Sequence, residues 1–259
     1  MTTSDGAARS SHALDDWHAI DSDIRSYLKL SEKWSAAAYS NAWDEAKREF
    51  SERFDPDNDD PQEYLYDFLN RMSYLWEVDY LWMLRAGALR DAVTAFEVYA
   101  EESAEEALRR FRAIGTGGVA HRLTPFVEKR LLSPSWRNLC RIHEALGSRL
   151  ETGNVQYIRD LRHLLVHQRG ELRTEELRRK FLAETGPRRG GPFDSRDIPL
   201  ARARVLQMMD DLASVIRTCD AALSKQAIGA EAPTALLSLV GGKRPALTLV
   251  ESRLGGPGA

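Results

Sequence analysis

The sequence predicts an all-α fold in which a helical bundle carries an extension at each end. Apolar residues recur at helical spacing over long stretches of the 259-residue chain. Residues that favour helix starts and ends separate these stretches. We expect an N-terminal helical extension over residues 1–60, a helical bundle over 61–228 and a short C-terminal appendage over 229–259.

Composition excludes several classes of protein. The formal net charge of -3 gives no overall attraction to nucleic acid or to an anionic membrane, so any RNA contact must be local. The two cysteines, Cys140 and Cys219, lie in apolar helical patterns, and the polar start resembles no signal peptide. No apolar run reaches the roughly 20 residues that span a bilayer. We therefore expect a cytoplasmic protein without a membrane segment.

The first apolar pattern, over residues 14–54, predicts one long helix or two consecutive helices. Residues 55–61, DPDNDDP, combine helix breakers with helix-starting residues and predict a solvated loop and cap. Calcium-loop spacing is missing from this acidic stretch. Residues 62–114 form the longest periodic pattern, with a broad apolar face, a possible break at Gly87 and an end at residues 115–118.

A short element is expected over residues 125–132, followed by a helix that Ser133 caps with Pro134 in its first position. Residues 147–153 predict a turn, after which Asn154 is expected to cap the next helix. That helix has a core-facing stripe and ends at Gly170. The stripe consists of Ile158, Leu161 and Leu165.

Thr174 is expected to cap a short charged helix that runs to about residue 185. Residues 186–197 predict an exposed loop, and residues 199–226 a long amphipathic helix. Residues 229–259 contain two short apolar runs. They fit a small hairpin, a docked helix and tail, or an oligomer contact, and the pattern does not choose between these.

Residues suited to phosphate chemistry gather in residues 159–170, RDLRHLLVHQRG. Arg162 and His167 flank four residues, and the polar His163 directly follows the arginine. On a regular helix Arg162 and His167 are about 140° apart, whereas His163 and His167 share a face. A single copy therefore presents a histidine pair with an arginine beside it. Bringing Arg162 and His167 together requires either a distorted helix near Gly170 or a second copy of the helix.

Arg162, His163 and His167 resemble the arginine, polar residue and histidine signature of the HEPN superfamily. The resemblance covers roughly residues 65–223 in helical layout, and its specific part is the dozen residues quoted. It implies an antiparallel four-helix core and a homodimer whose signature helices form a composite RNA cleft. It also implies metal-independent endoribonuclease activity without a cofactor, in a toxin or antiviral defence effector. A separate antitoxin or sensor protein is a possible partner.

On this resemblance Arg162 and His167 are the catalytic pair. Arg162 would hold the scissile phosphate, and His167 would transfer protons to or from the ribose 2′-OH or the leaving oxygen. His163 would orient the pair or bind phosphate. Glu97 resembles an acidic residue on an earlier helix of many such nucleases, and Arg159 is a further supporting candidate. Weaker supporting candidates are Tyr99, Gln168 and Arg169.

Three other interpretations of the signature stay open. His163 and His167 have the spacing of two metal ligands, although no third ligand is signalled nearby. Both histidines fit ordinary surface or interface positions, with Arg162 paired to a carboxylate. A non-catalytic module that dimerises, or that binds nucleotide or RNA, would use the same helix.

Overall fold

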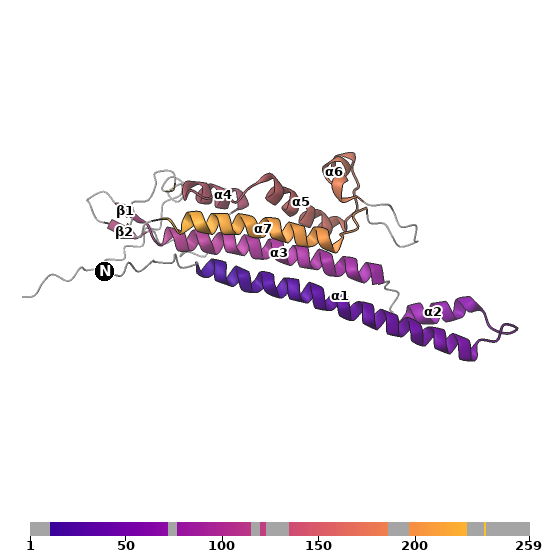
Figure 1. Cartoon of the computed structure of the whole chain (residues 1–259). Coiled ribbons are helices and arrows are strands. Elements are labelled where there is room, and N and C mark those ends of the chain that lie inside the picture. The colour runs from indigo at the N-terminus through magenta and orange to yellow at the C-terminus, as the bar shows by residue number, and fades with distance from the viewer. Residues whose placement is uncertain are drawn as a thin grey trace, which may run out of the picture. The chain divides into compact units, whose positions relative to one another are not determined.

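The computed structural model of the chain describes residues 11–71, 77–114, 120–122, 135–185, 197–226 and 236. These residues are mostly helical, as the sequence predicts, with one pair of short strands (Figure 1). No helix in the described ranges combines the length and the apolar character that crossing a bilayer requires. The expected element over residues 125–132, with Ser133 and Pro134, lies outside the described residues, as do residues 186–196 and nearly all of 229–259.

The N-terminal pattern forms one helix, α1, His12–Arg53, which confirms the first of its two interpretations. A turn follows in which the Asn58 side chain donates to Asp55 at 2.7 Å. Asp60 accepts a hydrogen bond of 2.8 Å from the amide of Gln62, at the start of α2, Pro61–Arg71. The acidic stretch is therefore the loop and cap that the sequence predicts.

Helix α3, Glu77–Leu108, passes through Gly87 without a break, because that glycine occupies an ordinary helical position. The helix ends at Leu108, earlier than the expected end at residues 115–118. Strand β1, Arg112–Ile114, follows it and pairs antiparallel with β2, Ala120–Arg122. The strand pair corrects the helical interpretation of residues 109–114, where the apolar spacing fits either structure.

Helix α4, Trp136–Ala145, has Ser135 at its N-cap position, and the Ser135 side chain makes no capping hydrogen bond. Helix α5, Gly153–Gln168, begins one residue before the expected cap Asn154. Thr152 is the cap instead, since its Oγ1 accepts from the amide of Val155 at 3.2 Å. The residue at which the helix begins decides which side chain reaches a free backbone amide, and Asn154 already lies inside the helix.

The remaining elements largely follow the sequence. Thr174 caps α6, Glu175–Lys180, by accepting from the amide of Leu177 at 3.2 Å. A 3-10 turn, η1, Leu182–Glu184, extends it. Helix α7, Arg202–Leu223, begins three residues after the expected start at Pro199.

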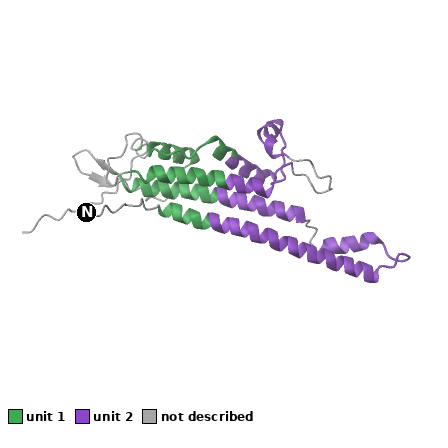
Figure 2. Cartoon of the chain, viewed as in Figure 1, with its two compact units in different colours: residues 1–20, 94–157, 210–259 green, residues 21–93, 158–209 purple. Residues whose placement is uncertain are grey.

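The chain divides into two compact units, each assembled from separate segments (Figure 2). Unit 1 comprises residues 1–20, 94–157 and 210–259, and unit 2 comprises residues 21–93 and 158–209. The division of the sequence into an extension, a bundle and an appendage stays a prediction.

Unit 1 is held by contacts between distant segments. The Tyr99 hydroxyl donates to the carbonyl oxygen of Ile216 at 3.3 Å, and Gln226 Nε2 donates to the carbonyl oxygen of Leu146 at 2.7 Å. Burial raises the pKa of the Cys219 thiol to about 11, so this thiol stays protonated at neutral pH. Unit 1 is therefore stabilised by helix packing together with buried side-chain hydrogen bonds to backbone carbonyls.

In unit 2 a carboxylate joins three segments. Glu32 of α1 accepts from Arg85 of α3 at 2.7 Å and lies 3.3 Å from Arg202 at the start of α7. Nearby, the indole Nε1 of Trp82 donates to the carbonyl oxygen of Ile198 at 2.8 Å. These contacts connect α1, α3 and the start of α7 within unit 2.

The signature helix as a candidate functional site

The part of α5 that belongs to unit 2 is anchored by its apolar side. Ile158, Leu161 and Leu165 are at most 5% exposed, which confirms the predicted core-facing stripe, and Leu164 is buried beside them. Burial of four large side chains on one side fixes the rotation of the helix about its axis. The residues between them must then face outward or lie at the flank of the core.

His163 and His167 lie on the outward side of α5, and both are exposed. Their ring centroids are 4.3 Å apart and their planes are inclined at 47°. The shared face predicted from their spacing is therefore confirmed. Two exposed imidazoles at this separation can both act as hydrogen-bond partners for an anion.

Arg162 lies at the flank of the buried side and is only partly exposed. Its Nε is buried, and no described residue accepts a hydrogen bond from it. Leaving a buried donor without a partner costs about 1–3 kcal/mol, and more for a charged group. No carboxylate among the described residues forms an ion pair with Arg162.

The geometry of α5 bears on the two ways of joining Arg162 with His167. The helix is continuous from Gly153 to Gln168 and has no break at either residue. On a continuous helix the two side chains leave the axis about 140° apart. Within these bounds, one copy of α5 with regular geometry does not direct both side chains to one point.

The helix ends as the sequence predicts. Arg169 has φ 53° and Gly170 has φ 79°, the left-handed conformation that stops a helix. Gly170 also leaves no room for a side chain, because an added Cβ would lie 2.9 Å from Cζ2 of Trp82. Two residues after Gly170, the backbone amide of Leu172 donates to the carboxylate of Asp197 at 2.8 Å. Gly170 is thus required by both conformation and packing.

Helix α6 contacts α5 through an ion pair. Lys180 Nζ lies 2.6 Å from a carboxylate oxygen of Asp160, which is one turn before His163 on α5. Arg179 is exposed on the same short helix. The ion pair between Lys180 and Asp160 places a lysine next to the helical turn that carries His163. All three residues belong to unit 2.

The supporting candidates have different surroundings. Arg159 is partly exposed on α5, and Gln168 has a buried Oε1 that accepts no hydrogen bond from the described residues. Glu97 is partly exposed on α3 and belongs to unit 1, so its pairing with Arg162 stays a prediction. Tyr99 is 1% exposed and burial raises the pKa of its hydroxyl, and its supporting role stays a prediction.

Metal ligation was an open interpretation of the histidine pair. Among the described residues, no three His, Cys, Asp or Glu side chains are grouped to hold an ion. Asp160, the nearest carboxylate along the helix, is paired with Lys180. His163 and His167 therefore form at most a two-ligand site within the described chain.

One buried histidine was not singled out by the sequence. His143 of α4 is fully buried, and its Nε2 lies 2.8 Å from the carbonyl oxygen of Ala100. Because a carbonyl only accepts, Nε2 carries the proton, and Nδ1 accepts from the Ser148 hydroxyl at 2.8 Å. Burial lowers the pKa of His143 to about 4. The only sign of this burial in the sequence was the position of His143 in an amphipathic helical pattern. Its two hydrogen bonds give it a structural role.

Comparisons with protein-family models, with curated proteins and with solved structures gave no match for this chain.

Proposed function

We propose that the protein is a homodimeric, metal-independent endoribonuclease whose site combines Arg162 and His167 from facing copies of α5. The observation that carries the proposal is an arginine without a described partner, Arg162, on the helix that exposes two histidines. Its Nε is buried without a described partner, on the helix that exposes His163 and His167. Arg162 as a whole is partly exposed and forms no ion pair with a described carboxylate, so its guanidinium group is available to bind a phosphate oxygen.

In the proposed reaction the ribose 2′ oxygen attacks the adjacent phosphorus, and the bond from phosphorus to the 5′ oxygen breaks. The products are a 2′,3′-cyclic phosphate and a 5′ hydroxyl. His167 takes the 2′ proton or delivers one to the leaving oxygen, and Arg162 stabilises the negative charge on the phosphoryl oxygens. His163, 4.3 Å from the His167 ring, orients this imidazole or binds phosphate.

The geometry of α5 supports the proposal of a second copy. Because the continuous helix separates Arg162 and His167 by about 140°, a facing α5 is the simplest source of the complementary group. The HEPN-type arrangement would place two such pairs along one RNA cleft. A toxin or antiviral effector under the control of an antitoxin or sensor is the biological role that this resemblance suggests.

The test uses the full chain and a labelled single-stranded RNA in buffer with EDTA. Arg162→Ala and His167→Ala should each lower the rate of cleavage at least 100-fold, a typical cost of losing proton transfer or charge stabilisation. His18→Ala and Arg217→Ala are matched controls, since both residues are exposed and lie outside α5. Circular dichroism checks that each variant folds.

Two results would reject the nuclease. One is cleavage retained by both α5 variants, and the other is activity that EDTA removes and zinc or manganese restores. A chain that binds RNA in an Arg162-dependent manner without cutting it would instead be the non-catalytic module.

A further inference from the structure

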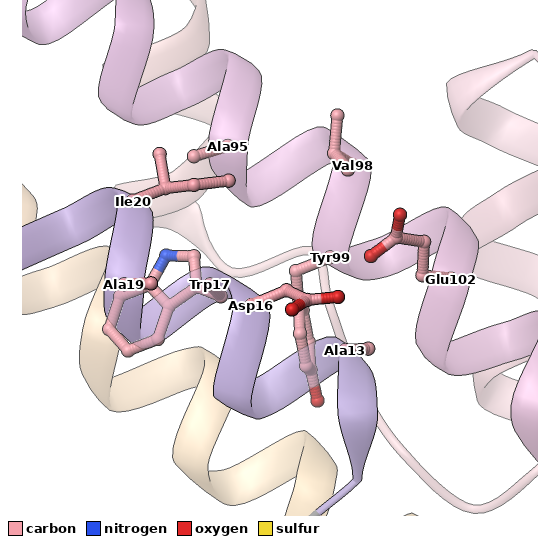
Figure 3. A pocket seen from close by; sticks show the side chains of 9 residues that line it. All are labelled: Ala13, Asp16, Trp17, Ala19, Ile20, Ala95, Val98, Tyr99 and Glu102. Carbon is pink, nitrogen blue, oxygen red and sulfur yellow. The ribbon is translucent and has the colours of Figure 1, made fainter.

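A cavity of about 300 Å³ lies within unit 1, between the first turns of α1 and the middle of α3 (Figure 3). Trp17 and Tyr99 supply aromatic walls, and both are nearly buried. Ala13 and Ala95 also line the cavity, and their short side chains leave space between the two helices. Its volume is at the lower end of the range for small-molecule sites.

The cavity is fixed by contacts on both helices. The amide of Ala13, at the start of α1, donates to Glu106 of α3 at 2.9 Å. The side chains of Ser11 and Asp220 are hydrogen-bonded, and Tyr99 is held by its bond to the carbonyl oxygen of Ile216. A ligand would therefore enter a site that is already formed, which lowers the entropy cost of binding.

The mouth of the cavity includes two exposed apolar side chains. Ile20 is 40% exposed and Val98 is 39% exposed, and both line the opening. Covering these side chains would remove apolar surface from water, which is favourable. The occupant should therefore have an apolar body.

Two carboxylates add charge to this mouth. Asp16 comes from α1 and Glu102 from α3, and Figure 3 shows their carboxylates extending toward one another. Burial and the nearby charge of Asp16 raise the pKa of Glu102 above its usual value. No described cation pairs with Asp16 or Glu102. By contrast, Glu105, also on α3, pairs with Arg109. Two facing carboxylates without a cation attract a positive ligand.

We propose that this cavity binds a small amphipathic amine. The ammonium group lies between Asp16 and Glu102, where it relieves the repulsion between the two carboxylates. The apolar body lies against Trp17, Ile20 and Val98, which line the cavity. A neutral apolar ligand would leave the carboxylates repelling each other, and an anion would increase that repulsion.

The test is an NMR titration of the full chain with 4-phenylbutylamine, following the Trp17 indole signal that a Trp17→Phe variant identifies. The neutral probe 4-phenylbutan-1-ol has the same apolar body. For the wild type we expect a dissociation constant on the order of 1 mM or tighter for the amine. The alcohol should bind at least five times more weakly.

Asp16→Asn combined with Glu102→Gln should remove the preference for the amine while leaving the weak binding of the alcohol. Glu101→Gln is the matched control, because Glu101 neighbours Glu102 on α3 but does not line the cavity. Ala19→Leu, at an exposed position of the lining, should block both probes without disturbing the core.

The proposal is overturned if the titration does not saturate, or if the alcohol binds as tightly as the amine. It is also overturned if the preference for the amine survives the double substitution, or if Ala19→Leu leaves the binding of both probes unchanged.

Discussion

The indole ring of Trp82 occupies the space where any side chain at Gly170 would lie. The closest approach to a Cβ would be 2.9 Å, from the ring atom Cζ2, and the indole itself is fixed by its hydrogen bond to the carbonyl oxygen of Ile198. The residue that closes the signature helix is therefore tied to the core of unit 2.

Gly170→Ala should lower the free energy of unfolding by about 2–4 kcal/mol. Roughly 1 kcal/mol comes from the left-handed backbone conformation, and the rest comes from overlap with the indole. Gly147→Ala is the matched control, since its φ is 77° but its nearest Cβ neighbour, Gln226 Nε2, is 3.7 Å away. Urea denaturation of both variants measures the difference. If both variants lost the same free energy of unfolding, the overlap between the new methyl group and Trp82 would add no cost.

The buried imidazole of His143 should make the protein sensitive to mild acid. Its folded pKa of about 4 is below the ordinary value of 6.5, so the unfolded chain binds a proton first as the pH falls. The stability that the neutral ring supports is complete above pH 6.5. It declines by about 3 kcal/mol as the pH falls to about 4.

Urea denaturation between pH 7.5 and pH 4 should show this loss in the wild type, and His143→Gln should flatten the dependence by the same amount. His18→Asn controls for an exposed histidine. An unchanged pH profile in the His143 variant would mean that other groups cause the acid sensitivity.

Arg162→Met separates a functional arginine from a structural one. Methionine keeps much of the apolar stem and removes a buried Nε that has no described partner. The free energy of unfolding should stay within about 0.5 kcal/mol of the wild type or rise by about 1 kcal/mol, because an unsatisfied donor is lost. RNA cleavage should be abolished in the same preparation. A loss of 3 kcal/mol or more would instead indicate a structural ion pair.

Mixing two inactive variants tests whether the site is shared between copies. If one site takes Arg162 from one chain and His167 from the other, a heterodimer of Arg162→Ala with His167→Ala keeps one intact site. Half of the dimers are mixed after random exchange, so activity should recover to about a quarter of the wild type. The variants are unfolded together and refolded, then assayed against each variant alone. A site confined to one chain predicts no recovery.

Local sequence patterns predicted the helices well. Periodic apolar spacing set α1 and α7 to within a few residues, and Thr174 was recognised because a capping residue acts on its own helix. Where two local signals competed, sequence was less reliable. Thr152 caps α5 in place of Asn154, and β1 replaces the expected end of α3.

Properties of the site that depend on one helix were also predictable. The shared face of His163 and His167 follows from helix geometry alone. The buried Nε of Arg162 and the approach of Asp16 to Glu102 were not predictable, because they depend on segments distant in the sequence. Packing decides those contacts, and no local pattern encodes them.

The exposed pair of His163 and His167 also affects how the protein is purified. Two imidazoles one helical turn apart, with ring centroids 4.3 Å from each other, form a bidentate chelator for nickel or zinc. The untagged chain should be retained on an immobilised-nickel column, and His163→Ala should elute earlier. Metal carried through purification would occupy the nitrogen atoms that the proposed proton transfer needs. Adding a chelator should then raise the measured rate of cleavage, the opposite of its effect on a metal-dependent nuclease.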